Sequence, residues 1–176
     1  WAWQSRMLQR PITFIRSCRN RVTEDGLNSI QPKQKIERKG AQMIDIQEHL
    51  KSARRTGEIE FFIVERKEDC VVSRMPVAAG ILNPFGTVQA GAMLWLADVT
   101  ATVLAIGKTR LGQKGQGFPL AINLNAHLLG NQRGGDIRAE ARFVRKGKRV
   151  TVVRTRVIGD SDQILAEVTT THVPAA

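Results

Sequence analysis

One apolar stretch with a single acid in its middle constrains this chain most. From Ala90 to Gly107 the side chains are almost all small or apolar, and the only charged residue among them is Asp98. This length and continuous apolarity predict a helix that is hydrophobic nearly all round and is therefore wrapped by protein. The stretch contains no lysine or arginine that could pair with Asp98. Because burying an unpaired carboxylate is costly, the acid is either held by a partner from elsewhere or kept for chemistry.

Two simpler interpretations of this stretch compete with a functional one. A transmembrane helix needs about 20 apolar residues, and this stretch is shorter, with an acid in its middle and a turn just before it. The other interpretation is an ordinary core helix, in which Asp98 accepts hydrogen bonds from a neighbouring backbone or hydroxyl group.

The residues before the stretch favour a sharp turn into the helix. Asn83-Pro84-Phe85-Gly86 has the composition of a turn, because proline fixes φ and glycine allows a positive φ. The first helical amides, near Gln89, Ala90 and Gly91, then lack intrahelical acceptors and lie at the positive end of the helix dipole. The residues there are small, so a carbonyl group can approach the backbone closely and these amides can stabilise an oxyanion.

The same helix is expected to carry an acid and a hydroxyl group on one face. Thr102 follows Asp98 by four residues, which is about one helical turn. An anion-stabilising helix start followed by an acid and a hydroxyl is suited to attack on an acyl carbonyl.

The spacing of these residues resembles the motif of a known family. The run Asn83-x-x-Gly86-x-x-Gln89-Ala90-Gly91, followed by Leu96-Ala97-Asp98, is similar to the motif of hotdog-fold acyl-CoA thioesterases of the phenylacetate-pathway, or PaaI-like, group. In that motif Asn-x-x-Gly-x-x-His-Gly-Gly precedes a Leu-x-Asp or Leu-x-Glu element whose acid comes after six intervening residues. All spacings fit without a gap, but Gln89 replaces the usual histidine and Ala90 the first glycine.

The resemblance implies a role for each matched residue. Asp98 would be the general base that activates water, or the nucleophile that attacks the thioester. The amide of Ala90, together with that of Gly91, would hold the thioester oxygen, and Thr102 would assist near Asp98. Alanine can still donate this contact, because the donor is a backbone amide.

Two further positions take roles from the same resemblance. Gln89 would orient or polarise the thioester carbonyl, and Asn83 would position water or the acyl group across a dimer. A side-chain amide donates a hydrogen bond but does not titrate near neutral pH. A non-catalytic module that binds acyl-CoA therefore remains the alternative to an enzyme, and a dehydratase of the same fold is a second enzymatic alternative.

The rest of the chain predicts one α+β domain over residues 43–176. A short amphipathic helix is expected from Ile44 to Arg54, and strands are expected at Glu58 to Glu65, Asp69 to Val77, Leu120 to Leu129, Asp136 to Val144, Arg149 to Ile158 and Gln163 to Val173. Leu120 to Leu129 alternates apolar and polar residues, which predicts a half-buried strand. Short turns favour antiparallel neighbours. An antiparallel sheet wrapped around one long apolar helix agrees with the hotdog fold. The resemblance further implies homodimers or homotetramers paired edge to edge, with active sites at the dimer interface.

The first 42 residues differ from this domain. They contain nine lysines and arginines against three acids, so the net charge of +11 divides into +6 for residues 1–42 and +5 for the remainder. We interpret residues 1–42 as a disordered extension translated from upstream of a native start at Met43; an arginine-rich, acid-poor mitochondrial presequence is the alternative. A cytoplasmic location is therefore expected, with a mitochondrial one as the alternative.

Basic residues and apolar residues suggest how a substrate would be held. Arg133, Arg145, Lys146 and Lys148 are candidates to meet the phosphates of coenzyme A, although a solvated hairpin is the simpler explanation for the last three. Met75, Phe85, Met93 and Trp95 are candidates for an acyl pocket and allow a medium-chain or aromatic acid.

The sequence predicts no cofactor beyond coenzyme A as part of the substrate, and no metal site. The two cysteines and the histidines His49, His127 and His172 are scattered, and each histidine is expected to be a surface or strand residue. We expect neither a nucleic-acid partner nor a membrane, because no sequence motif supports one.

Overall fold

The computed structural model describes residues 57–109 and 115–176 of the chain. The predicted extension over residues 1–42 and the predicted helix from Ile44 to Arg54 lie outside the described residues, as does the middle of the predicted loop from Thr109 to Gly117. The described ranges contain the whole apolar stretch and all of the strands predicted around it.

The apolar stretch forms one helix, α2 (Ala90–Ile106), as predicted. It follows the extended residue Gln89 and ends at Gly107, whose φ of 52° suits glycine. The buried residues recur at the three- and four-residue spacing of one helix face, and they are Ala92, Met93, Leu96, Ala97, Thr100, Ala101 and Leu104. No helix in the two described ranges is long and apolar enough to cross a membrane.

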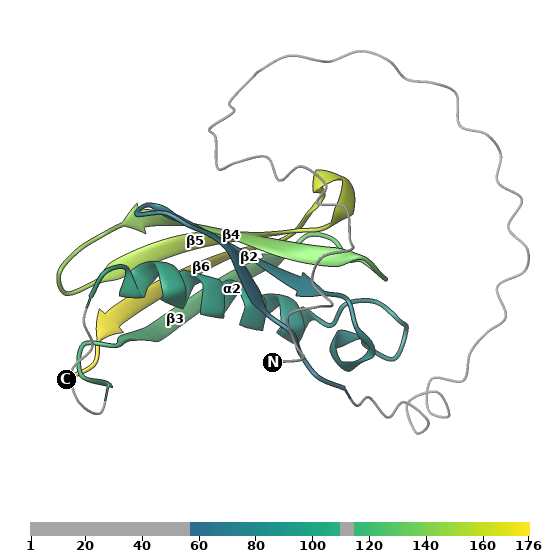
Figure 1. Ribbon diagram of the computed structural model, residues 1–176, viewed down its shortest axis with the longest axis horizontal. Coiled ribbons are helices and arrows are strands. Elements are labelled where there is room, and N and C mark those ends of the chain that lie inside the picture. Colours follow the sequence, from purple (N-terminus) through teal and green to yellow (C-terminus); the bar gives the residue numbers. More distant parts are fainter. Residues whose placement is uncertain (1–56, 110–114) are drawn as a thin grey trace, which may run out of the picture. The chain divides into compact units, whose positions relative to one another are not determined.

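Within one chain, α2 is not wrapped on all sides as its composition predicted. Figure 1 shows the helix lying along one face of a curved sheet. The side chain of Trp95 is 41% exposed, and Asp98 and Thr102 are half-buried. Because a curved sheet covers a helix from one side only, the other apolar side of α2 stays partly open in a single subunit.

The strands form one six-stranded sheet in the order β1-β2-β4-β5-β6-β3. Every pairing between these strands is antiparallel, which confirms the predicted arrangement. The strands are β1 (Phe62–Arg66), β2 (Cys70–Pro76), β3 (Pro119–Leu128), β4 (Asp136–Arg145), β5 (Thr151–Ile158) and β6 (Ile164–Pro174).

Strand β3 is an exposed edge strand, so the prediction that it is half-buried was wrong. It pairs with β6 on one side, while its sequence neighbour β4 lies between β2 and β5. Its apolar side chains are also open to solvent in one subunit: Leu120 is 48% exposed, Ile122 61%, Leu124 41% and Leu128 52%. An edge with apolar side chains and unpaired backbone groups is a template for pairing with another strand.

The core between α2 and the sheet has two apolar clusters. The N-terminal half of α2, including Met93 and Leu96, packs against residues of β2, β4, β5 and β6. The C-terminal half, with Ala101 and Leu104, packs in the second cluster. Between them Thr100 Oγ1 donates a hydrogen bond to the carbonyl oxygen of Leu96 at 2.6 Å and lies 2.5 Å from the hydroxyl oxygen of Ser73 on β2. This contact fixes how α2 is rotated on the sheet.

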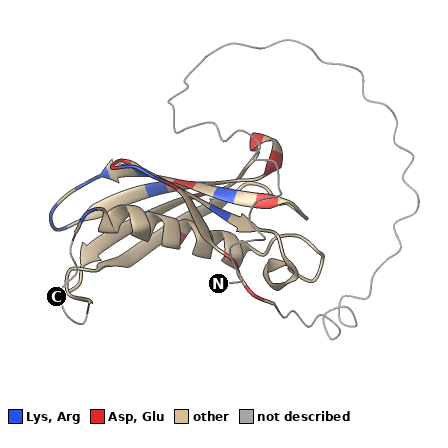
Figure 2. Ribbon diagram, viewed as in Figure 1, with Lys and Arg blue, Asp and Glu red and all other residues tan. Residues whose placement is uncertain are grey.

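The charged side chains of the central strands lie on the sheet face away from α2. Residues of β4 alternate between buried and half-buried, and Arg138 pairs with Glu140 at 3.1 Å and with Asp162 at 2.7 Å. Figure 2 shows both charge signs on the sheet and its turns, whereas α2 is free of colour except at its one acid. Exposed ion pairs of this kind contribute little to stability, but their position leaves the helix-facing side of these strands largely uncharged.

Candidate active site

The turn before α2 is built around the side chain of Asn83. Its Oδ1 accepts hydrogen bonds from the backbone amides of Phe85 at 2.9 Å and Thr87 at 3.2 Å, and its Nδ2 donates to Thr87 Oγ1 at 2.6 Å. Gly86 has a φ of 73°, a left-handed conformation that glycine adopts without strain. The predicted sharp turn is confirmed, and Asn83 shapes the loop that leads into the helix.

The start of α2 is anchored on one side and open on the other. The amide of Gln89 donates to the carbonyl oxygen of Ile81 at 2.8 Å, and that of Val88 donates to Gln132 at 2.8 Å. The amides of Ala90 and Gly91 have no acceptor among the residues that the structure describes. Gly91 is exposed, and a Cβ atom added to it would have no atom within 4 Å. Two N–H groups without an acceptor in the described ranges thus lie at the positive end of the helix, next to the open space at Gly91.

Gln89 lies at this opening as the residue that precedes the helix. It is exposed, and its side chain makes no capping hydrogen bond. Its amide group is therefore available to a ligand near the Ala90 and Gly91 backbone.

Asp98 lies in the middle of α2 and has two different oxygens. The residue is half-buried, but its Oδ1 is buried and has no hydrogen-bond partner within the described ranges. Leaving a buried carboxylate oxygen without a donor is unfavourable, and such groups call for a functional explanation. Thr102 is half-buried one turn further along the helix, as predicted for a hydroxyl on the same face.

The helix start and Asp98 are too far apart in one subunit to act on one carbonyl group. Ala90 and Asp98 are separated by eight residues, which is about 12 Å along a helix with a rise of 1.5 Å per residue. A tetrahedral centre needs its base and its oxyanion donors within roughly 3 Å of the reacting atoms. A site that uses both groups must therefore combine two subunits.

His172 is a buried polar residue that the sequence interpretation had placed among ordinary surface or strand histidines. It is 1% exposed and lies on β6, where its Nε2 is 2.9 Å from Thr170 Oγ1. Its Nδ1 is buried without a hydrogen-bond partner among the described residues. Burial lowers the pKa of His172. A hydrogen bond with the Pro119 backbone and the negative charge of Asp98 both raise it, but by less. The ring is therefore neutral at neutral pH and lies within electrostatic range of Asp98.

The basic residues predicted to meet coenzyme A fall into two groups. Arg133 donates from Nη1 to the carbonyl oxygen of Phe85 at 2.8 Å, so it lies beside the turn that leads into α2. Arg145, Lys146 and Lys148 lie at the turn between β4 and β5, and Phe143 near this turn packs against the cluster that contains Leu104. Figure 1 shows this turn and the Asn83 loop at opposite ends of α2. Arg133 is therefore not grouped with the other three within one subunit.

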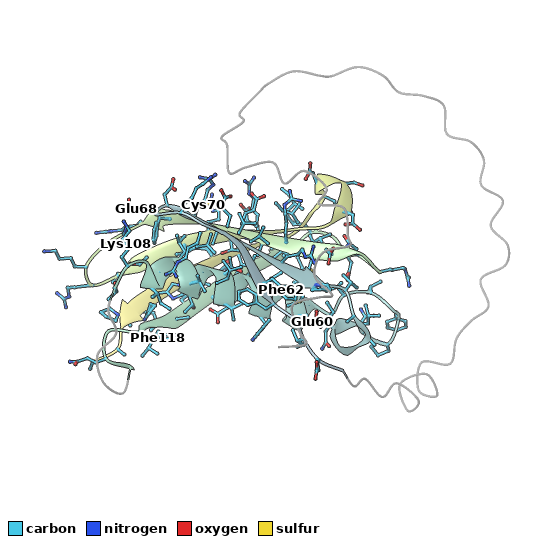
Figure 3. The ribbon with its side chains drawn as sticks, viewed as in Figure 1. Glu60, Phe62, Glu68, Cys70, Lys108 and Phe118 are labelled. Atoms are coloured by element: carbon cyan, nitrogen blue, oxygen red, sulfur yellow. The ribbon has the colours of Figure 1, made fainter. Side chains whose placement is uncertain are left out.

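The predicted acyl-pocket residues divide in the same manner. Met75 and Met93 are 0% and 1% exposed and belong to the core, so the prediction that they line a pocket was wrong. Phe85 and Trp95 are 49% and 41% exposed. Trp95 meets the ring of Phe61 edge to face, with ring centroids 5.9 Å apart. Figure 3 shows Glu60 and Phe62, on either side of Phe61, at the opposite end of β1 from Glu68 and Cys70.

Metal-binding clusters are not seen in the part of the chain that the structure describes. No group of three or more histidine, cysteine, aspartate or glutamate residues there is placed to hold a metal ion.

Comparisons with known proteins locate this architecture among solved structures. No protein-family model and no curated protein matches the sequence. A glutamine-to-alanine variant of a thioesterase from Staphylococcus aureus superposes with a TM-score of 0.62 at 22% identity, covering 66% of this chain and 93% of that one. A thioesterase from Haemophilus influenzae gives 0.58 at 20% identity, covering 64% and 76%. A variant of the phenylacetic acid degradation protein PaaI from Thermus thermophilus gives 0.57 at 18% identity, covering 65% and 92%. The chain has the hotdog fold that these proteins share.

Proposed function

We propose that this protein is an acyl-CoA thioesterase that hydrolyses its substrate to a free acid and coenzyme A. The observation that carries the proposal is Asp98, the only charge on an apolar helix, half-buried and with one oxygen lacking a hydrogen-bond donor among the described residues. A second observation supports it, because the same helix begins with two free amides that suit a developing oxyanion.

The proposed active unit is a homodimer joined through β3. Each subunit presents β3 as an edge with exposed apolar side chains, and two such edges pair symmetrically into one continuous sheet. Asp98 of one subunit would then face the Asn83 loop and helix start of the other. In one chain Ala90 and Asp98 are about 12 Å apart along the helix. In the dimer, the Asp98 of one subunit can act together with the Ala90 amide of the other. Dimers of this kind can assemble further into tetramers.

The proposed reaction divides the work among these groups. Asp98 accepts a proton from a water molecule, whose oxygen attacks the thioester carbon; direct attack by the carboxylate is the variant with a covalent intermediate. The amides of Ala90 and Gly91 stabilise the oxyanion of the tetrahedral intermediate. When that intermediate collapses, the carbon–sulfur bond breaks and the coenzyme A thiolate leaves and takes up the proton. Gln89 orients the carbonyl group and Thr102 assists Asp98.

Asn83 has a role of its own in this proposal. Its side chain holds the turn that delivers the helix start, so it acts on the reaction through the placement of the Ala90 and Gly91 amides. The observed hydrogen bonds favour this role over direct positioning of water.

The relatives of known structure support the importance of two positions. The Staphylococcus aureus protein has been solved with a glutamine and with a glutamate replaced, and these two positions are 15 residues apart. Asn83 and Asp98 have the same separation of 15 residues. The correspondence favours a shared use of the turn residue and the helix acid.

The substrate is proposed in two parts. We place the phosphates of coenzyme A near Arg133 at the helix start, with the cations Arg145, Lys146 and Lys148 available at the other end of the helix. We place the acyl group against the exposed ring of Trp95 and the half-buried ring of Phe61, which suit a medium-chain or an aromatic acid. Replacing Arg133 with alanine should raise KM for acyl-CoA more than it lowers kcat. The substitution removes binding energy that is the same for the bound substrate and for the transition state.

A non-catalytic acyl-CoA-binding module is the second candidate. Gln89 favours it, because a glutamine side chain does not titrate in place of a histidine. Two measurements distinguish the enzyme from the binding module. Thiol release is measured with medium-chain and aromatic acyl-CoAs, and calorimetry measures the binding of thioether analogues that cannot be hydrolysed. Turnover of any thioester supports the enzyme, whereas tight binding of analogues with no turnover supports the module.

A further inference from the structure

We propose that the sheet face turned away from α2 binds a small phosphorylated molecule, whose phosphate group lies between the guanidinium groups of Arg142 on β4 and Arg154 on β5. The candidate active site is on the helix side of the sheet, so the two sites are separate. The proposal therefore does not depend on the proposed thioesterase function.

Alternation along β4 and β5 places both arginines on the outer face of the sheet. Ala139 and Ala141 are 0% exposed and belong to the core beneath α2, so Arg142, the next residue, points to the other face. On β5, Val153 belongs to the same core and Arg154 follows it. The register places Arg142 directly opposite Arg154.

The neighbouring row of side chains on this face is balanced in charge. Across the sheet, Glu140 lies opposite Arg156, and Arg156 lies opposite Glu167. Glu140 Oε2 is 3.7 Å from Arg156 Nη2, and Glu140 Oε1 is 3.1 Å from Arg138 Nε. Acids and bases alternate here, so this row needs no further counter-ion.

The row that contains Arg142 and Arg154 has no acid. Cys70 of β2 lies beside Arg142, Thr169 of β6 beside Arg154, and Asn125 of β3 beside Thr169. Like charges at directly opposed strand positions repel each other, and no carboxylate of this row compensates them. Guanidinium, hydroxyl and amide groups can all donate hydrogen bonds to the oxygens of an anion.

Arg142 is the arginine of this pair with the least compensation. It is half-buried, and no ion pair or hydrogen bond joins it to another described residue. Arg154 has one long contact, from Nε to Glu167 Oε1 at 3.9 Å. Its two terminal nitrogens have no acceptor in the described ranges. Because a partly buried charge without a partner is unfavourable, an anion between the two arginines stabilises both.

A hollow in the sheet face lies at this pair. Its volume is about 190 Å³, several times the roughly 30 Å³ that a water molecule occupies in the liquid, so a phosphate group fits. The lining is formed by Glu140, Arg142, Arg154, Arg156 and Glu167. Three arginines minus two glutamates give it a net charge of +1.

The donors of the hollow favour phosphate over a carboxylate. A phosphate monoester has three terminal oxygens, so it can accept hydrogen bonds from two guanidinium forks at once. The two oxygens of a carboxylate are occupied by one fork. The glutamates at the edge of the hollow repel an extended polyanion, which favours a small ligand over nucleic acid.

Calorimetry on the full chain with inorganic phosphate tests the site, with sodium chloride used to hold the ionic strength constant. Phosphate should bind saturably at one site per subunit. Arg142→Gln and Arg154→Gln should each weaken binding by about tenfold or more, because each removes charge-assisted hydrogen bonds.

Arg74→Gln is the matched control for these variants. It removes the same charge from the same sheet face, but Arg74 lies outside the hollow and pairs with Asp136. It should change the Kd for phosphate by no more than about twofold, since exposed charges at a distance are screened. A second measurement is thermal unfolding: phosphate should raise the Tm of wild type but not of Arg142→Gln. Without phosphate, Arg142→Gln should itself raise the Tm, because the repulsion between the opposed arginines is removed.

Four results would overturn the proposal. One is no saturable binding at about 10 mM phosphate, which is ten times a millimolar Kd. Another is an equal loss of binding in Arg74→Gln and Arg142→Gln. A third is an oligonucleotide that binds the same arginines more tightly than phosphate does, with a steep dependence on salt. The fourth is a loss of coenzyme A binding in Arg142→Gln, which would make the hollow part of the thioesterase substrate site. If the protein hydrolyses no thioester, the phosphate measurement still decides this proposal.

Discussion

Replacing Ala90 with proline removes one proposed oxyanion donor with little effect on the fold. Ala90 is the first residue of α2, where proline is well accepted because the N–H has no intrahelical acceptor and the fixed φ suits a helix. Proline also requires an extended residue before it, and Gln89 has φ −69° and ψ 138°. The change therefore deletes a backbone N–H at the site and keeps the helix start in place.

The expected loss is in turnover and not in stability. Removing one oxyanion donor lowers kcat by about 10²- to 10³-fold, or roughly 2.7–4 kcal/mol of transition-state stabilisation. The free energy of unfolding should change by no more than about 0.5 kcal/mol, as for other tolerated surface changes. KM should change little, because the lost interaction strengthens only as charge develops on the oxygen.

Thiol release at saturating acyl-CoA measures kcat, and thermal unfolding checks the fold. Ala90→Gly is the matched control, since it changes the same side chain but retains the amide N–H, and it should keep nearly full activity. A folded Ala90→Pro protein whose kcat stays within about threefold of wild type, less than 1 kcal/mol in barrier height, would refute the assignment of the Ala90 amide.

Three further predictions follow from burial and charge. Ile122→Asn places a polar side chain on β3 at the proposed dimer edge. Ile122 is 61% exposed in one subunit, and its burial in a pair is worth about 1–2 kcal/mol per copy. Because the dimer loses this contribution twice, the substitution should raise the dimer Kd roughly 30- to 700-fold. Sedimentation should show this dissociation for Ile122→Asn and not for Ile63→Asn on the β1 edge; dimers that survive the first change or are lost in the second would count against pairing through β3. Leu96→Ala should lower the free energy of unfolding, measured in urea, by about 2–5 kcal/mol, because Leu96 is fully buried. The control Val144→Ala, at an exposed position, should change it by no more than about 0.5 kcal/mol. Similar losses in both variants would contradict the described core. The free energy of unfolding should also fall as pH drops below about 6.5, the ordinary histidine pKa. Burial lowers the pKa of His172 in the folded protein, so the unfolded chain binds the proton more readily. The Tm advantage of wild type over His172→Asn should therefore shrink across this range, and a constant difference would argue against a neutral buried ring.

The sequence predicted the elements of the fold closely, because the relevant patterns are local. Alternating residues predicted Asp136 to Val144 as a strand, and the structure has β4 from Asp136 to Arg145. Continuous apolarity predicted α2 to within one residue of its end. The strand order was not predictable in the same way, since β3 pairs with β6 and not with the next strand in the chain. Pairing between distant strands depends on the whole sheet. The half-buried β3 was predicted from alternation alone, which does not show whether the faces of a strand are covered by other elements.

The candidate site was predictable where it depends on spacing along the chain. The turn at Asn83, the helix start at Ala90 and the position of Asp98 all follow from one continuous segment. His172 was missed, although alternation along β6 places it on the same face as the buried Val168 and Thr170. The separation of Arg133 from the turn between β4 and β5 is a property of the assembled fold, because residues close in sequence end at opposite ends of α2.

Complementation between two inactive variants tests the central claim of a site shared across the dimer most directly. Asp98→Asn lacks the base and Ala90→Pro lacks the oxyanion donor, and each is expected to be nearly inactive alone. If each site combines Asp98 of one subunit with the helix start of the other, a mixed dimer has one intact site. Refolding equal amounts together should then restore about a quarter of wild-type activity, since about half of the dimers are mixed and each has one intact site of two. No recovery, with mixed dimers demonstrably formed, would contradict a shared site.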